Sequence, residues 1–240
     1  MEHSIETGQA KPVYAKPHRI PNAWSEEVKQ NVKEMLDNGV ILPSSSPWNS
    51  PIILVHRKGK ARFVCDYRDL NKETKRDTYP LPNMKDCIEK MEGAKFFTTL
   101  DAASAYWSVK IKESDREKTA FSLPHGKYEF NVMPFGLNNA SATYQRLIDI
   151  CLSGLPASRM IAYLDDIVIF SKSFSEHMSD VEKVFKRLSD TKISLRADKC
   201  LIASDEVNFL GYHLSESGIK PQSDLVDAIN SFKRPNSKKK

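Results

Sequence analysis

The sequence predicts an α+β domain in which helices back an antiparallel sheet. Helical and strand-like segments follow one another irregularly, whereas a parallel α/β fold would show a regular strand–helix–strand series. Two apolar runs, 160–164 and 167–171, are separated by only two residues, which is typical of a tight hairpin. With 240 residues, 40% of them hydrophobic, the chain is long enough for one large domain or two small ones.

Helices are predicted where apolar residues recur at helical spacing. Residues 1–23, which contain several prolines and little periodicity, are instead expected to form an extended arm. The expected helices run from Ser25 to Gly39, at 84–91, at 138–152, after Ser175 and from about Ser223. Ser25 and Ser175 are the predicted N-caps of their helices, because a serine hydroxyl accepts a hydrogen bond from an unpaired first-turn N–H.

Strands are predicted from short runs rich in β-branched and aromatic residues. These runs are 52–56, 62–67, 96–100, 107–111, 118–122, 127–132, 160–164 and 167–171, with a strand pair at 206–214. The first two are joined by a basic turn. Most of the remaining runs are short, which suits an antiparallel sheet with tight connections.

Acidic residues end or interrupt apolar strands at two places. Asp165 and Asp166 stand together between the two runs of the predicted hairpin, and Asp101 follows the strand at 96–100. Adjacent carboxylates repel each other and are costly to bury, and a divalent cation relieves both effects. If these strands are neighbours, three carboxylates meet at one sheet edge and could bind two Mg²⁺ ions. A solvated acidic turn and a helix cap at Asp101 are the ordinary alternatives, and the spacing leaves them open.

Charge and composition exclude few classes of partner. The formal net charge of +5 permits binding to nucleic acid without requiring it. The four cysteines show no metal-binding spacing, so we expect reduced thiols in a reducing compartment. No signal peptide and no apolar run of about 18 residues is apparent, so no membrane partner is expected.

Five stretches occur in an order that is specific to one family. They are SPWNSPIILVHRKGKARFVCDYRDLNKET (46–74), FFTTLDAASAYWSVKI (96–111), KTAFSLPHGKYEFNVMPFGLNNASATYQRLID (118–149), YLDD (163–166) and NFLGYHLSESGI (208–219). Together they resemble reverse transcriptases, most closely those of gypsy-type long-terminal-repeat retrotransposons and more distantly those of retroviruses. The resemblance extends from about residue 17 to the end of the chain.

The resemblance implies roles for individual residues. Asp101, Asp165 and Asp166 would be the catalytic ligands of two Mg²⁺ ions, with Mn²⁺ as an alternative. The residues that match nucleotide-binding positions are Arg62, Lys58 or Arg57, Tyr106, Gln145 and Lys199. Tyr106 matches the steric gate, whose ring would clash with the 2′-hydroxyl of a ribonucleotide. The primer grip is matched by Phe209, Leu210, Gly211 and Tyr212.

The resemblance also implies the fingers and palm of a right-hand polymerase, with the thumb largely absent. The antiparallel sheet would then belong to the palm. The implied parts are an extended N-terminal arm at 1–23, mainly fingers at 24–95, mainly palm at 96–220 with a fingers insertion around 113–135, and the start of a truncated thumb at 221–240.

The implied function is that of an RNA-directed DNA polymerase, which adds dNTPs to a primer on an RNA or DNA template by two-metal phosphoryl transfer. Further partners would be other parts of a Pol polyprotein or a second copy of the chain. The expected location is cytoplasmic, within virus-like particles. Two alternatives stay open: a catalytically silent retroelement remnant that binds nucleic acid or protein, and an unrelated metal-dependent nucleotide enzyme.

Overall fold

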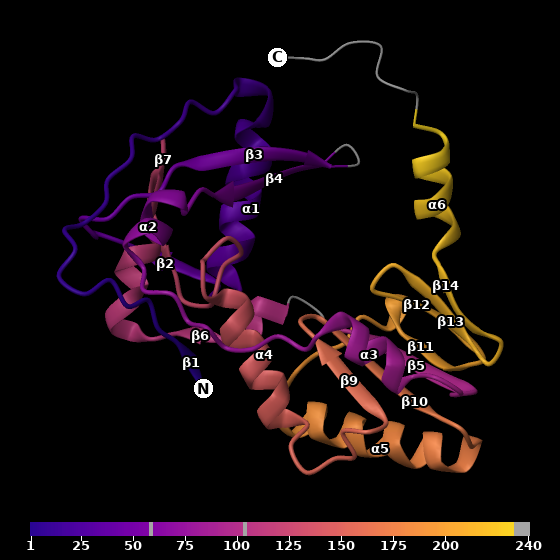
Figure 1. The fold of residues 1–240 in the computed structure, drawn as a ribbon. Coiled ribbons are helices and arrows are strands. Elements are labelled where there is room, and N and C mark those ends of the chain that lie inside the picture. The colour runs from indigo at the N-terminus through magenta and orange to yellow at the C-terminus, as the bar shows by residue number, and fades with distance from the viewer. Residues whose placement is uncertain (58–59, 103–104, 233–240) are drawn as a thin grey trace. The chain divides into compact units, whose positions relative to one another are not determined.

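The computed structural model describes residues 1–57, 60–102 and 105–232, which form two compact units (Figure 1). Unit 1 combines Met1–Pro80 with Ser104–Ile150, and unit 2 combines Leu81–Ala103 with Cys151–Lys240. The chain therefore passes between the units at three points. The division into fingers, palm and thumb follows other limits along the chain and stays a prediction.

Unit 2 is built on a four-stranded antiparallel sheet with the strand order β11-β5-β10-β9. Its strands are β5 (Phe96–Asp101), β9 (Met160–Tyr163), β10 (Asp166–Ser171) and β11 (Leu201–Ser204). The predicted hairpin is confirmed, because β9 and β10 pair with only Leu164 and Asp165 between them. Helix α5 (Phe174–Asp190) runs along this sheet (Figure 1).

A second, smaller sheet and two further helices complete unit 2. The sheet has the order β12-β13-β14. Its strands are β12 (Glu206–Phe209), β13 (Tyr212–Ser215) and β14 (Gly218–Pro221). Helix α3 (Met84–Lys90) precedes β5, and helix α6 (Ser223–Asn230) begins at the predicted residue.

Both faces of the four-stranded sheet are covered, because successive side chains of a strand point to opposite faces. Val168 and Phe170 of β10 belong to a hydrophobic cluster that also includes residues of α3, β12 and β13. Ser171 points to the other face, where it meets His177 of α5. Full burial of a side chain such as Phe170 stabilises the fold by roughly 1.5–3 kcal/mol.

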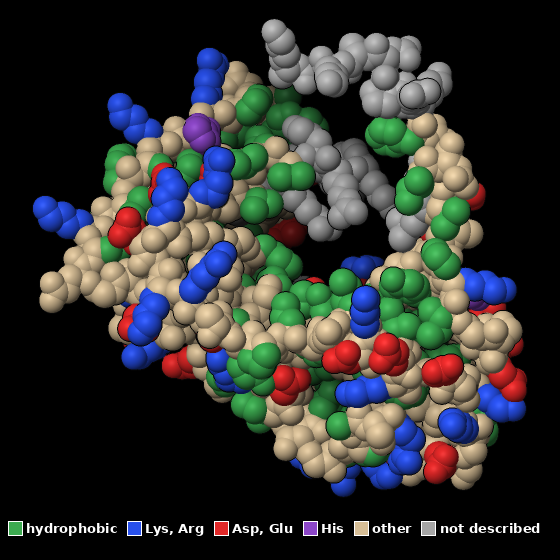
Figure 2. Space-filling view, in the orientation of Figure 1, with side chains coloured by type: hydrophobic (Ala, Val, Ile, Leu, Met, Phe, Trp, Pro, Cys, Tyr) green, Lys and Arg blue, Asp and Glu red, His purple; other side chains and the backbone are tan. Residues whose placement is uncertain are grey.

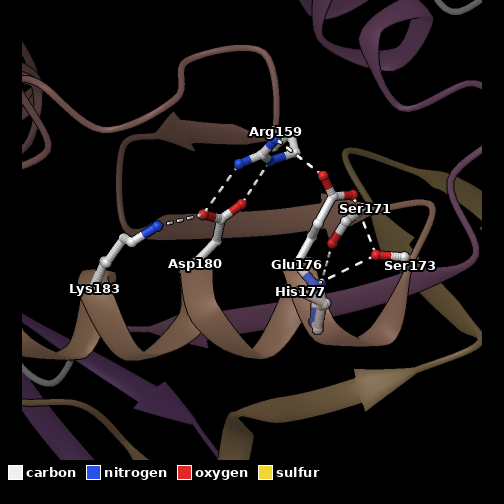
Figure 3. A network of polar contacts seen from close by, with 7 residues as sticks. All are labelled: Arg159, Ser171, Ser173, Glu176, His177, Asp180 and Lys183. Atoms are coloured by element: carbon white, nitrogen blue, oxygen red, sulfur yellow. Dashed lines mark hydrogen bonds and ion pairs between the residues drawn. The ribbon is translucent and has the colours of Figure 1, made fainter.

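Polar contacts hold α5 against the sheet (Figure 3). The His177 ring is fully buried, with Nε2 2.7 Å from Thr98 Oγ1 and Nδ1 2.8 Å from Ser171 Oγ. One turn further along α5, the Asp180 carboxylate accepts a hydrogen bond of 2.6 Å from Arg159 Nε. Because every one of these buried polar groups has a partner, their burial carries little penalty.

Unit 1 contains smaller sheets surrounded by helices. Its strands are β1 (Glu2–His3), β2 (Ile41–Pro43), β3 (Ile52–Arg57), β4 (Lys60–Cys65), β6 (Lys110–Ile111), β7 (Phe121–Leu123) and β8 (Gly126–Phe130). They form a three-stranded sheet in the order β2-β8-β7, an antiparallel β3-β4 pair and a parallel β1-β6 pair. The helices and 3₁₀ turns are η1 (Asn22–Trp24), α1 (Ser25–Asp37), α2 (Arg68–Glu73), η2 (Ala105–Ser108), η3 (Glu113–Thr119) and α4 (Ala140–Cys151).

Both predicted N-caps are wrong. Ser25 already has helical backbone angles, because η1 runs directly into α1 and Trp24 becomes the capping residue. The cap of α5 is Ser173, two residues before the predicted Ser175, and its hydroxyl accepts the N–H of Glu176. Ser173 and Glu176 form the S-x-x-E pattern of a capping box, which is the signal that identifies this start.

Two other expectations differ in detail. The first two residues of the strand predicted at 107–111 belong to the 3₁₀ turn η2, in which Ser108 Oγ donates to the Ala105 carbonyl, and only the last two form β6. The start of the predicted N-terminal arm is packed into unit 1, since His3 and Ile5 are buried.

The surface of unit 2 carries basic and acidic side chains interspersed on the face seen in Figure 2. Over this face, the positive net charge is therefore not gathered into a single basic patch. None of the helices in the described part of the chain is long and apolar enough to cross a membrane. The four cysteines are free thiols, as expected.

Candidate functional site

The antiparallel register of β5 and β10 places two acidic residues side by side. Asp166 is the direct cross-strand partner of Asp101, and the Ala102 N–H donates to the Asp165 carbonyl across the same end. The β9–β10 turn contains only Leu164 and Asp165, and Leu164 has a φ of 52°. This backbone region costs a residue with a Cβ roughly 1–2 kcal/mol. The strained residue Leu164 thus directly precedes Asp165 and Asp166, the two adjacent aspartates that the sequence singled out.

The Asp165 and Asp166 carboxylates lie in an unfavourable electrostatic environment. Burial, followed by the neighbouring Asp166 and Asp101, raises the pKa of Asp165 above its ordinary value. Burial and Asp101 likewise raise the pKa of Asp166, and Lys199 partly opposes this. Among the described residues, the buried Oδ1 of Asp165 has no hydrogen-bond partner. An unpaired buried carboxylate oxygen costs stability, so this end of the sheet suits a cation.

Two basic residues from one short segment supply part of the missing positive charge. The Arg196 N–H donates to the Asp101 carbonyl, which holds this segment beside the end of β5. From there, Lys199 Nζ, at the end of η4 (Ala197–Lys199), lies 3.1 Å from Asp101 Oδ2, and Arg196 Nε lies 4.0 Å from Asp101 Oδ1. Lys199, predicted from the family resemblance, therefore lies beside the carboxylates, and Arg196 is a neighbour that the sequence did not reveal.

A cavity of about 340 Å³ opens at this point. Its lining includes Asp101, Asp166 and Lys199 together with Asn208, Phe209 and Leu210 of the β12–β13 hairpin, and also Thr99 and Leu100. Two of the four predicted primer-grip residues thus line the cavity beside the carboxylates. Gly211 and Tyr212 belong to the same hairpin but not to this lining.

The β12–β13 hairpin has a geometry that its sequence explains. Phe209 pairs with Tyr212, so the turn consists of Leu210 and Gly211 alone. Both turn residues have positive φ, 50° and 82°, as in the type I′ turn that joins twisted antiparallel strands. Gly211 adopts this conformation without steric cost, and the tight turn brings Leu210 to the cavity.

The donor set at the carboxylates suits Mg²⁺, which prefers oxygen ligands. Asp101 and Asp166 are cross-strand partners, and Asp165 has a buried oxygen without a protein donor. As the side chains stand, no group of three His, Cys, Asp or Glu side chains in the described ranges is arranged around a metal position. Asp101 Oδ2 contacts Lys199 instead, so this oxygen would have to leave the ammonium in order to bind a metal ion.

The predicted steric-gate residue lies in unit 1, in an aromatic cluster. The Tyr106 ring is 5.0 Å from the Phe135 ring and 5.7 Å from the Tyr144 ring, measured between centroids. Tyr106 Oη lies 3.1 Å from Ser141 Oγ of α4. These contacts fix the orientation of the phenol ring, which a steric gate requires. Phe135, half exposed and in contact with the Tyr106 ring, is a neighbour that sequence reasoning missed.

Gln145 of α4 also lies in unit 1 and is fully buried. Its Nε2 donates to Asp149 Oδ1 over 2.9 Å, and Asp149 Oδ2 accepts from Tyr79 Oη over 2.7 Å. Asp149 thereby fixes the orientation of the Gln145 amide. The nucleotide contact predicted for Gln145 stays a prediction.

The basic fingers residues are only partly described. The backbone of Arg62 lies on β4 opposite Val55 of β3, which places it within the predicted hairpin. Arg57, the alternative to Lys58, ends β3. Lys58 itself falls outside the described residues, so the assignment of the fingers lysine stays a prediction.

Comparison with known proteins gives a consistent family. Residues 49–214 match the family described as reverse transcriptase (RNA-dependent DNA polymerase). The chain is 40% identical over 241 aligned positions to a retrovirus-related Pol polyprotein from transposon 297 of Drosophila melanogaster, covering 98% of this chain and 23% of that protein. It is 38% identical to the corresponding polyprotein from transposon gypsy of the same organism, covering 97% and 23%. The chain thus spans about a quarter of the length of these relatives.

Solved structures agree with this assignment. The foamy viral protease-reverse transcriptase in complex with RNA/DNA hybrid matches with a TM-score of 0.88 and 26% identity, over 98% of this chain and 32% of that one. The same protein in complex with dsDNA matches with a TM-score of 0.89 and 26% identity, over 98% and 49%. The predicted α+β fold of a polymerase fingers and palm is thereby confirmed. The chain belongs to the reverse transcriptase family and is similar to the Pol polyproteins of gypsy-type retrotransposons.

Proposed function

We propose that this chain is an RNA-directed DNA polymerase that adds dNTPs to a primer paired with an RNA or DNA template. The observation that carries the proposal is the cross-strand pairing of Asp101 with Asp166, next to the buried and unpaired oxygen of Asp165. A protein that kept these residues for stability alone would pair them with donors. Complexes of the similar foamy viral protein with dsDNA and with RNA/DNA hybrid support a primer and template as partners.

The residues of this chain bind and position the reacting groups. Asp101, Asp165 and Asp166 are the residues that would hold two Mg²⁺ ions, and the ions would supply charge stabilisation for the phosphoryl group and activation of the primer 3′-hydroxyl. Lys199, once released from Asp101, is free to pair with the triphosphate. Phe209 and Leu210 give the cavity an apolar wall against which the primer end packs. The contribution of these residues is mainly orientation.

Tyr106 selects the sugar. Its ring is fixed by Phe135 and Tyr144, so it cannot easily turn away from a 2′-hydroxyl. Tyr106→Ala should increase the use of rNTPs relative to dNTPs, because only a steric obstacle is removed. Tyr106→Phe, which keeps the ring and loses the hydroxyl that contacts Ser141, should leave the ratio nearly unchanged. Equal ratios for Tyr106→Ala and the parent chain would exclude the gate.

The proposed activity is tested by primer extension on an RNA template with and without Mg²⁺. Extension should need the metal and should be lost in Asp101→Asn. Asp205→Asn is the matched control, because it removes the same charge from an exposed position of unit 2. Template binding without extension under any metal condition would instead indicate a silent nucleic-acid-binding module.

The cellular setting is a further part of the proposal. The family resemblance makes a cytoplasmic location within virus-like particles the proposed setting. It also supports association with other parts of a Pol polyprotein or with a second copy of the chain. Sedimentation of the expressed protein with particles, or its absence from them, tests the setting independently of catalysis.

A further inference from the structure

Residues 2–7 are bound into unit 1 by backbone and side-chain contacts on both sides. His3, Ile5 and Thr7 are 2%, 1% and 8% exposed. This alternation buries every second residue of the segment 2–7, as in a strand with one covered face. A terminal segment that served only as a loose connection would not bury three side chains in this way.

On one side the segment is bonded to β6 and η3. Glu2 and His3 pair in parallel with Lys110 and Ile111, and the Lys112 N–H donates to the His3 carbonyl over 2.8 Å. The Ile5 N–H donates to Asp115 Oδ2 over 3.0 Å.

An ion pair closes the same side of the segment. Lys118 Nζ lies 2.6 Å from the Ile5 carbonyl and 2.7 Å from Asp115 Oδ1. Both side chains are largely buried, so this ion pair is less screened than one on the surface. Ile5 is thus bound through both its N–H and its carbonyl.

On the other side the segment reaches α4. His3 Nδ1 lies 2.8 Å from Thr143 Oγ1, and both side chains are buried. This hydrogen bond joins residues 140 positions apart in the sequence. It links the first strand of the chain directly to the helix that carries Ser141, Tyr144 and Gln145.

The two elements joined by the segment are the ones that hold Tyr106. Strand β6 follows η2, the turn on which Tyr106 lies, after a single residue. Helix α4 supplies Ser141, which contacts the Tyr106 hydroxyl, and Tyr144, which packs against its ring. A small shift of α4 against β6 would therefore change the position of the gate ring.

We propose that residues 2–7 form a strap that locks α4 to β6, and that His3 is the positioning residue through which the strap sets the Tyr106 side chain and hence sugar selection. The inference rests on the proposed polymerase function only for its catalytic consequence. The strap itself is defined by contacts within unit 1, to residues other than the three aspartates. Loss of the strap should therefore affect nucleotide binding and selection more than the rate of the chemical step.

The test compares His3→Leu, which keeps bulk and loses the hydrogen bond, with His3→Gln, which retains an amide able to pair with Thr143. Glu2→Gln is the control at the adjacent exposed position. His3→Leu should weaken discrimination against rNTPs and raise KM for dNTPs, each by about fivefold, the scale of one hydrogen bond. kcat should change less. His3→Gln should recover most of the parent values, and Glu2→Gln should match the parent.

A second pair of measurements separates positioning from a general loss of folding. Thr143→Val should reproduce the effect of His3→Leu, and the double variant should show no further loss, because both remove the same bond. Hydrogen exchange should rise at 105–111 and 140–150 in His3→Leu and stay constant at 160–171. Unchanged discrimination and exchange in a folded His3→Leu chain would overturn the proposal. If the parent chain fails to extend primers, the polymerase proposal fails, while hydrogen exchange still decides whether the strap exists.

Discussion

The two ends of the four-stranded sheet of unit 2 differ in how their buried polar groups are paired. At the end near Ser171, the buried polar groups of α5 and β10 are matched to partners, with Arg159 pairing with Asp180 (Figure 3). At the other end, Asp101 and Asp166 face each other across two strands and Asp165 keeps an unpaired oxygen. The strands and the helix that support both ends are the same, so the difference lies in the side chains.

Exposure sharpens this contrast. The Asp180 side chain is 1% exposed, yet Arg159 lies 2.6 Å from it and Lys183 contributes a longer contact of 3.5 Å. The Asp101 side chain is 25% exposed. Its cations, Lys199 and Arg196, lie beside a cluster of carboxylates that also includes Asp165 and Asp166. The matched end contributes stability, whereas the unmatched end costs stability, as expected if the three aspartates serve the proposed activity. The following substitutions test this division of roles.

The largest effect on stability is expected at the matched end. Asp180→Asn leaves the Arg159 guanidinium without its buried counter-charge and should lower the free energy of unfolding by about 3 kcal/mol. Urea denaturation followed by circular dichroism measures this change, and Asp190→Asn at an exposed position of α5 is the control. Primer extension by the folded fraction should remain. Equal stability of the two variants would remove the contrast between the ends.

The opposite pattern is expected for Asp165→Asn. Loss of a metal ligand should lower the extension rate by at least about two orders of magnitude, or roughly 2.7 kcal/mol of barrier. Stability should be unchanged or higher, because the raised pKa of Asp165 shows that its charged form is disfavoured in the folded state. A variant that loses stability together with activity would show that Asp165 is a structural residue.

A pH effect of intermediate size is expected from His177. Burial lowers the pKa of His177 from its ordinary value of 6.5, although Asp180 opposes the shift. Near pH 6.5, His177 therefore binds a proton in the unfolded chain but stays neutral in the folded chain. Stability should be constant above that pH and should fall by up to about 1.4 kcal/mol per pH unit below it.

His3 contributes to the same pH range, because burial lowers its pKa to about 4. Removing one of the two histidines should therefore make the fall in stability below pH 6.5 shallower. His177→Gln should show this smaller slope, together with a plateau lowered by about 1–2 kcal/mol through the lost hydrogen bonds. An unchanged slope would mean that His177 is protonated in the folded chain.

The smallest effect is expected for Lys199→Ala. Lys199 is half exposed, so loss of its ion pair with Asp101 should change stability by less than about 1 kcal/mol. If Lys199 pairs with the triphosphate, KM for dNTPs should rise up to about tenfold with little change in kcat. Lys192→Ala, at another exposed position of unit 2, controls for net charge. A fall in kcat alone would assign Lys199 to the chemical step.

Local sequence signals predicted which helices and strands form better than they predicted the residues at which these begin and end. The hairpin at 160–171 and the start of α6 at Ser223 follow from periodicity and are confirmed. The caps at Ser25 and Ser175 were wrong by one or two residues, because a preceding 3₁₀ turn or a neighbouring capping box competes with an isolated serine. Residues such as Arg196 and Asn208 carry no local signal, since their position beside the carboxylates depends on distant chain segments.

The sequence by itself determined the short apolar runs that form the strands and the acidic residues that end them. These are local properties, because a run of β-branched and aromatic residues favours a strand without reference to the rest of the chain. Only the tertiary structure decided that Asp166 stands opposite Asp101, that Lys199 reaches them, and that His3 bonds to Thr143 across 140 residues. Such pairings depend on strand register and on packing between segments far apart in the chain, and many registers are compatible with one local pattern.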